Sequence, residues 1–210
     1  MTKELLFELM NTLGPSGNEE NVRKIISREI KGCVDEIKVD KMGNLVARVK
    51  GPGKKAMLTA HMDEIGLMIN KIEKSGYLRI SILGGIEPLT LVGHTVSILR
   101  KDNNVVCNGV ITFHELHNAL EIKEIPKIEY LYIDTGLGKK ELLKKGVEVG
   151  SYVVTKHRAN ILGNGKIISG KALDDRIGCY ILIQIIKNLK KPKTDSYFVF
   201  TVQEEVGLYG

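Results

Sequence analysis

Three short segments of the sequence carry side chains that suit the binding of metal ions. The first holds His61 and Asp63, the second holds the pair Asp174–Asp175 and the third holds the pair Glu204–Glu205. Imidazole nitrogen and carboxylate oxygen are good ligands for zinc, cobalt and manganese. A further carboxylate that is not a ligand can take a proton from the water that such a site activates. These residue types therefore predict metal-assisted hydrolysis.

The three segments fall where α/β enzymes place their sites. The apolar run 56–60 leads into His61, the strand-like run 197–202 leads into Glu204–Glu205, and Asp174–Asp175 begins a predicted helix. Ligands collect beyond the carboxyl ends of parallel strands, and helix N-termini favour carboxylates. Taken alone, an Asp before a helix is usually an N-cap, and adjacent glutamates are usually solvent-exposed. Three such segments at one predicted sheet edge favour a shared site.

The spacing of His61 and Asp63 predicts a direct contact between them. Residues two apart in an extended strand point to the same side. We therefore expect Asp63 to accept a hydrogen bond from the ring of His61 and to orient it, as the groups behind metal ligands commonly do.

Helical and extended patterns alternate through the first 60 residues. Apolar residues recur at helical spacing over 5–13 and again over 22–30. Ser16 and Glu19 lie between these two segments and predict a capping box at the start of the second helix. Segments 37–39 and 44–49 then predict a β-hairpin. The run 56–60 predicts a strand buried on both faces of a parallel sheet.

The middle of the chain has a different character. Short alternating segments, at 77–82, 95–99, 105–111 and 152–155, predict a small β-rich barrel or sandwich, interrupted by a short helix at 139–145. After residue 170 the α/β pattern returns, with a helix over 175–189 and a strand over 197–202.

The predicted fold is therefore an α/β domain with an inserted β-rich domain. The α/β domain comprises residues 1–70 and 162–210, and the β-rich insertion comprises residues 71–161.

Composition limits the partners and the compartment. The 210 residues carry a formal net charge of +6, but lysine and arginine are spread along the chain, so we do not expect nucleic acid as a partner. No apolar run is long enough to span a bilayer, so we do not expect a membrane partner either. The three cysteines have no close spacing and predict reduced thiols rather than disulfides. We expect a cytoplasmic protein.

Four longer motifs resemble one family of two-metal aminopeptidases, the M42 family of glutamyl, deblocking and tetrahedral aminopeptidases. They occur in the family's order and with its separation. The motifs are Gly-Pro-Ser-Gly at 14–17, Thr-Ala-His-Met-Asp-Glu-Ile-Gly at 59–66, Lys-Ala-Leu-Asp-Asp-Arg-Ile-Gly at 171–178 and Gln-Glu-Glu-Val-Gly at 203–207.

The resemblance implies a role for each residue of the site. His61 would bind one metal ion, Asp174 would bridge two, and Glu205 would bind the other. Glu204 would be the general base that activates the water, and Asp63 would orient His61. Zinc or cobalt would be the metal, and manganese suits the same ligands. The reaction would be the removal of N-terminal residues from peptides.

The resemblance also implies features of the fold and of the assembly. It implies a zinc-peptidase-like α/β sandwich, incomplete at its C-terminus, and a cis peptide bond between Asp174 and Asp175. The inserted domain would be an oligomerisation domain, since the family forms homo-oligomers in which dimers assemble into a dodecamer.

The same resemblance leaves two alternatives open. The family's remaining ligands, an Asp and a His, lie downstream of residue 210, so a truncated or degenerate non-catalytic form is one of them. A related co-catalytic metallo-carboxypeptidase or deacylase is the other. The segment His-Glu-Leu-His at 114–117 is one residue short of a zinc signature and falls in the β-rich region, so we expect no metal there.

Overall fold

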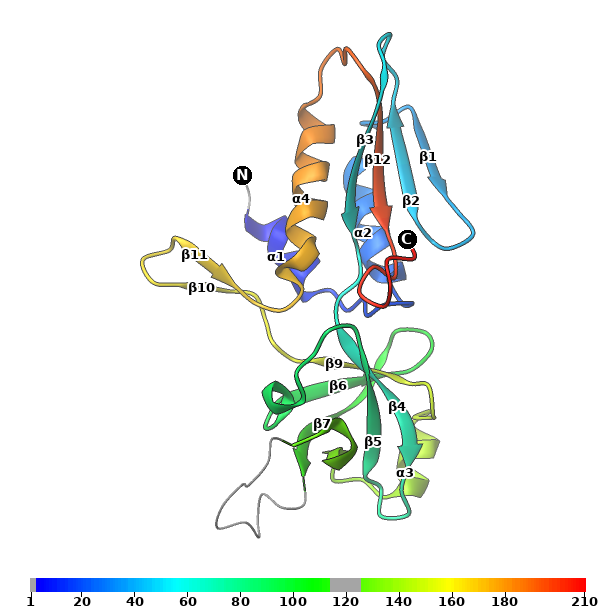
Figure 1. The fold of residues 1–210 in the computed structure, drawn as a ribbon, viewed down its shortest axis with the longest axis vertical. Helices are drawn as coiled ribbons and strands as arrows, with labels where there is room; N and C mark the ends of the chain where they lie inside the picture. Colours follow the sequence, from blue (N-terminus) through cyan, green and yellow to red (C-terminus); the bar gives the residue numbers. More distant parts are fainter. Residues whose placement is uncertain (1–2, 114–125) are drawn as a thin grey trace. The chain divides into compact units, whose positions relative to one another are not determined.

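The computed structural model describes residues 3–113 and 126–210, so the histidine segment 114–117 lies outside the described residues. The chain forms two compact units. The first contains Met1–Glu64 with His157–Gly210, and the second contains Ile65–Lys156. Strand β4 (Gly66–Ile72) lies wholly in the second unit, so the border falls at residue 64/65 rather than at 70/71. Both units are shown in Figure 1.

A four-stranded mixed sheet forms the centre of the first unit. Its strands, in spatial order, are β1 (Glu36–Val39), β2 (Leu45–Val49), β12 (Asp195–Thr201) and β3 (Lys55–His61). Strands β12 and β3 are parallel, and the other two pairs are antiparallel. The predicted hairpin is confirmed as β1–β2. The two predicted strands that lead to the site are confirmed as β3 and β12.

Three helices pack on the sheet with their apolar residues. They are α1 (Lys3–Asn11), α2 (Glu20–Ile30) and α4 (Leu173–Asn188). Leu9, Ile26 and Ile183, one from each helix, are fully buried in a single core with Phe198 and Phe200 of β12. The apolar residues that recur at helical spacing in the sequence are therefore the residues that the helices bury in this core.

The prediction that run 56–60 is buried on both faces is wrong. Within β3, Ala60 is buried, but Met57 is 70% exposed. Side chains alternate along a strand, so the face that carries Met57 is the one that the core of α1, α2 and α4 does not cover.

The predicted capping box is also wrong. Helix α2 begins at Glu20, with Glu19 at the N-cap position, and no side chain caps it. The Ser16 hydroxyl instead donates a 2.6 Å hydrogen bond to Asp63, 47 residues away. Glu19 accepts the amide of Gly17, at 2.7 Å, and also that of Gln203, 184 residues away. Ser16 has therefore exchanged its local partner for a distant one, and Glu19 has gained a distant one.

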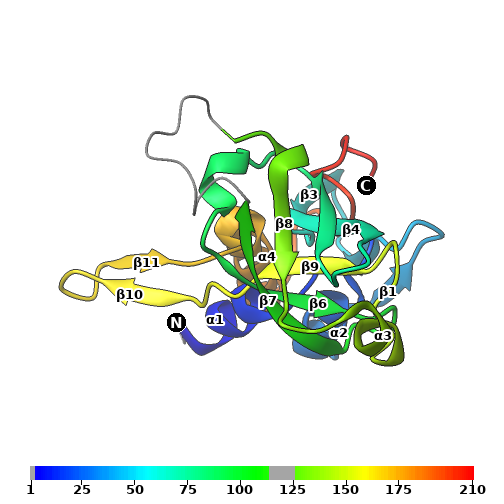
Figure 2. The same ribbon diagram turned by 90° about the horizontal axis from the view of Figure 1, so that it is seen from below.

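A hairpin that the sequence analysis missed precedes α4. Strands β10 (Asn160–Leu162) and β11 (Ile167–Ser169) pair antiparallel, and Figure 2 shows them as a narrow arm. They are three residues each, too short for alternation to be detected in the sequence.

The second unit is a closed six-stranded barrel, which confirms the predicted β-rich insertion. Its strand order is β4-β5-β8-β7-β6-β9. The bounds are β5 (Leu78–Leu83), β6 (Thr95–Leu99), β7 (Val105–Phe113), β8 (Leu131–Asp134) and β9 (Tyr152–Thr155). Helix α3 (Lys139–Lys144) and the short 3₁₀ helices at Pro88–Leu91 and Ile128–Tyr130 complete it. Closure leaves no free edge on the barrel.

Among the described residues, no helix combines the length and the apolar composition needed to cross a bilayer.

The three cysteines are unpaired and differ in exposure, which makes their reactivity a test of the fold. Cys33 is exposed, Cys107 is half-buried and Cys179 is buried. Burial raises the pKa of the Cys179 thiol to about 12. Because the thiolate is the reactive form, we expect an aromatic disulfide reagent at pH 8 to label Cys33 quickly and Cys179 only after unfolding. Equal labelling rates for these two in the folded protein would contradict the packing of α4.

Candidate metal centre

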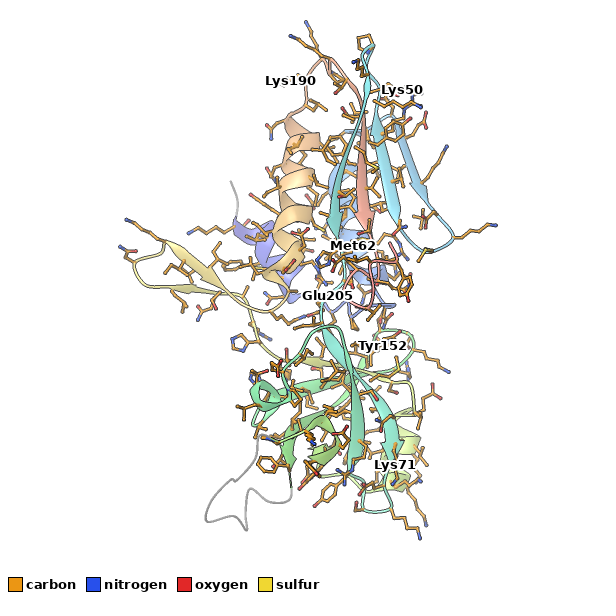
Figure 3. The ribbon with its side chains drawn as sticks, viewed as in Figure 1. Lys50, Met62, Lys71, Tyr152, Lys190 and Glu205 are labelled. Atoms are coloured by element: carbon orange, nitrogen blue, oxygen red, sulfur yellow. The ribbon has the colours of Figure 1, made fainter. Side chains whose placement is uncertain are left out.

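The ends of the two parallel strands bring the first and third predicted segments together. Thr201 of β12 is in register with His61 of β3, and the Met62 amide donates to the Thr201 carbonyl at 2.7 Å. The chain after each strand therefore leaves the sheet at the same edge, where Figure 3 labels Met62 and Glu205. The prediction that these side chains share one end of one sheet is confirmed.

His61 is the central side chain of this cluster. Its Nε2 lies 3.1 Å from Oδ1 of Asp174 and 3.8 Å from Oε2 of Glu204. The His61 side chain is 10% exposed, whereas that of Asp174 is 87% exposed. The start of α4 therefore places a solvated carboxylate on a nearly buried imidazole.

The other ring nitrogen of His61 faces Asp63. Nδ1 lies 3.3 Å from Oδ1 of Asp63, although this buried nitrogen has no partner with the geometry of a hydrogen bond. Burial by itself would lower the pKa of His61. The carboxylates of Asp63, Asp174 and Glu204 outweigh it and raise the pKa to about 9.

Asp63 also makes hydrogen bonds that the sequence analysis did not predict. It is fully buried and accepts hydrogen bonds from the Ser16 hydroxyl and, at 3.1 Å each, from the amides of Glu204 and Glu205. Burial would raise the pKa of this carboxyl, but His61, Ser16 and the two amides outweigh it and hold the pKa at about 2. Asp63 thus contacts His61 and also holds the backbone of Glu204 and Glu205.

The acidic side chains gather around His61. Ligand atoms of His61, Glu204 and Glu205 lie within 4.8 Å of one another, and Asp174 approaches this group through its contact with His61. Burial raises the pKa of Glu205 and of Asp175. The peptide bond between Asp174 and Asp175 is cis, as the family resemblance implied.

A pocket of about 340 Å³ opens at the same place. His61, Asp175 and Glu204 line it, together with residues from the ends of β3 and β12. The cluster is therefore reachable by a small molecule or by the end of a peptide.

A buried ionic network behind the cluster was also missed. Lys171 contacts both carboxylate oxygens of Glu64 at 2.7 and 2.6 Å, and Glu64 accepts the Gly14 amide at 3.0 Å. The Arg176 guanidinium is fully buried, donates to four backbone carbonyls of the described residues and lies 3.8 Å from Glu64. The only sign of this network in the sequence was that Lys171 and Arg176 flank Asp174. Their partners could not be predicted, because they lie far away in the sequence.

The donor set fits divalent metal ions. One imidazole and several carboxylates converge at short distances, and the mutual repulsion of those carboxylates is relieved when a cation lies between them. Nε2 of His61 faces the carboxylates, and Nδ1 faces Asp63, which is the arrangement of an imidazole that binds metal through Nε2 and is oriented through Nδ1.

Comparison with known proteins matches this site to one family. The family model described as M42 glutamyl aminopeptidase matches residues 43–210. A putative aminopeptidase of Acetivibrio thermocellus is 42% identical over the whole chain, and a lysyl aminopeptidase of Pyrococcus furiosus is 34% identical over 99% of it. The chain spans 62% and 60% of the lengths of these two relatives.

Solved structures give the same result. An aminopeptidase from Desulfurococcus kamchatkensis has a TM-score of 0.91 at 37% identity, over 99% of this chain and 57% of its own. A TET1 peptidase of Pyrococcus horikoshii, which can assemble into a tetrahedron or a large octahedral shell, has a TM-score of 0.86 at 39% identity, over 97% of this chain and 62% of its own. On the fold, the site and these matches, the chain belongs to the M42 family of glutamyl aminopeptidases.

Proposed function

We propose that this chain carries part of the active site of a metal-dependent aminopeptidase, which removes N-terminal residues from peptides. The observation that carries the proposal is the convergence of His61, Glu204 and Glu205 within 4.8 Å at the carboxyl ends of β3 and β12. Membership of the M42 family supports the reaction class.

His61, Asp174 and Glu205 are the proposed metal ligands. Nε2 of His61 and Oδ1 of Asp174 lie 3.1 Å apart, which supports the proposal that they would share one cation. Asp174 would also contribute to a second cation, held by Glu205. Zinc or cobalt is the proposed metal. Divalent cations bound there would supply the Lewis acidity that activates water and polarises a peptide carbonyl.

Glu204 is the proposed general base. Its side chain lines the pocket and is 37% exposed, so it can reach a water molecule there. The carboxylate of Glu204 would hold the proton taken from the attacking water and pass it to the leaving amine. Asp63, through His61 and through the amides of Glu204 and Glu205, holds base and ligands in place.

We also propose a role for the inserted domain and a location for the protein. We assign homo-oligomerisation to the inserted domain, predicted at 71–161, and the similarity to the Pyrococcus horikoshii TET1 peptidase, which can assemble into a tetrahedron or a large octahedral shell, supports the oligomer. A cytoplasmic location is consistent with three unpaired cysteines.

The test is hydrolysis of matched peptides by the purified protein with added zinc or cobalt. We expect cleavage of a peptide with a free N-terminus, no cleavage of its N-acetylated form, and loss of turnover when a chelator removes the metal. Cleavage of the acetylated peptide would favour a deacylase, and release of the C-terminal residue would favour a carboxypeptidase. Stoichiometric metal binding without any turnover would favour the non-catalytic alternative.

A further inference from the structure

The chain that follows β12 is held by a row of side-chain acceptors. The amides of residues 202–205 are four consecutive donors, and each has a side-chain partner. Asn44 Oδ1 accepts the first at 2.9 Å, Glu19 Oε1 accepts the second at 3.1 Å, and Asp63 accepts the third and fourth at 3.1 Å each. Three separate parts of the chain thus fix the backbone that carries the base and one ligand.

Among the carboxylate acceptors of this row, Glu19 is the one whose burial is not explained by a contact with the metal centre or by capping of a helix. Only 5% of its surface is exposed, and it is not among the residues that line the pocket. It occupies the N-cap position of α2 but makes no capping hydrogen bond. Its two side-chain hydrogen bonds both end on Oε1, from the amide of Gly17 at 2.7 Å and from the amide of Gln203 at 3.1 Å.

The residue that Glu19 holds has an uncommon backbone conformation. Gln203 has a φ of 54°, in the left-handed region that residues other than glycine rarely adopt. Such a conformation persists only when neighbouring contacts hold it. Gln203 immediately precedes Glu204 and Glu205, so relaxation at Gln203 would redirect both carboxylates.

We propose that Glu19 is a positioning residue. By accepting the amide of Gln203, it fixes the backbone conformation from which the side chains of Glu204 and Glu205 reach the metal centre. Its effect on catalysis rests on the proposed function, but its effect on the backbone does not. What Glu19 supplies is a hydrogen-bond acceptor at a fixed distance. Glutamine places an oxygen at the same position without the charge, whereas aspartate keeps the charge and withdraws the oxygen by one methylene.

The test compares Glu19→Gln, Glu19→Asp and Glu19→Ala with a control, Glu20→Ala. Glu20 is the next residue, is exposed and pairs with Lys24 at 2.8 Å. The measurement is amide hydrogen exchange, by mass spectrometry, of the peptide that covers residues 202–207. Loss of a native hydrogen bond is expected to speed local exchange about ten-fold in the Asp and Ala variants. The Gln variant and the control are expected to match the unchanged protein.

The relative exchange rates of the variants decide whether the inference holds. Exchange as slow in Glu19→Asp as in the unchanged protein, or as fast in Glu19→Gln as in Glu19→Asp, would overturn it. If Glu19→Ala does not fold, the comparison of Asp with Gln still decides.

Binding of Co²⁺ alone, by calorimetry, separates this inference from the proposed function. Groups behind metal ligands typically alter affinity or activity 10- to 100-fold, so we expect about ten-fold weaker Co²⁺ binding in Glu19→Asp and little change in Glu19→Gln. Faster exchange in Glu19→Asp, together with no Co²⁺ binding by the unchanged protein, would uphold the backbone role and reject the metal centre. Unchanged exchange would reject the backbone role, whatever Co²⁺ does.

Discussion

Replacing Glu204 with glutamine is expected to lower kcat by about 10²- to 10⁴-fold, the usual contribution of a general base. The amide has nearly the shape of the carboxylate but takes up no proton at neutral pH. The measurement is kcat on a peptide with a free N-terminus, with metal content determined on the same sample. If Glu204 is the base and not a ligand, the variant keeps its metal.

The matched control is Glu205→Gln, one residue along the same loop. Both glutamates belong to the group of ligand atoms within 4.8 Å, so geometry alone does not separate their roles. We expect Glu205→Gln to lose metal first and turnover as a consequence. Equal loss of metal in the two variants would make Glu204 a ligand, and full turnover in Glu204→Gln would reject it as the base.

Replacing Arg176 with methionine is expected to cost about 3–5 kcal/mol of the free energy of unfolding, as the breaking of a buried ionic group does. The Arg176 side chain is fully buried and donates to the carbonyls of Leu9, Thr12, Gly14 and Met62. Methionine fills part of the volume but leaves these carbonyls without their donor. Glu64, 3.8 Å from the guanidinium, also loses a neighbouring cation.

Arg23→Met is the matched control for that measurement. Arg23 is half-buried on α2, and its side chain donates a hydrogen bond, at 3.0 Å, to the Gly43 carbonyl. Its loss is expected to cost about 1 kcal/mol. Urea unfolding of the three proteins gives the free energies. A cost for Arg176→Met no larger than that for Arg23→Met would show that the carbonyls find other donors.

The sequence was sufficient for those features that depend on near neighbours. Helices α1, α2 and α4 follow from apolar residues at helical spacing, and the hairpin β1–β2 follows from two strand-like runs around a turn. The grouping of His61 with Glu204 follows because each lies at or just beyond the end of an apolar strand, and the carboxyl ends of parallel strands meet at one edge.

The tertiary structure decided what the buried polar groups contact. Ser16 and Glu19 have the spacing of a capping box, yet Ser16 bonds Asp63 and Glu19 bonds Gln203, 184 residues away. The exposure of Met57 and the burial of Arg176 likewise depend on which elements pack on each face. Local patterns determine secondary structure because its hydrogen bonds are mostly local. The partner of a buried side chain is set by which segments the fold brings together, and no local pattern encodes that.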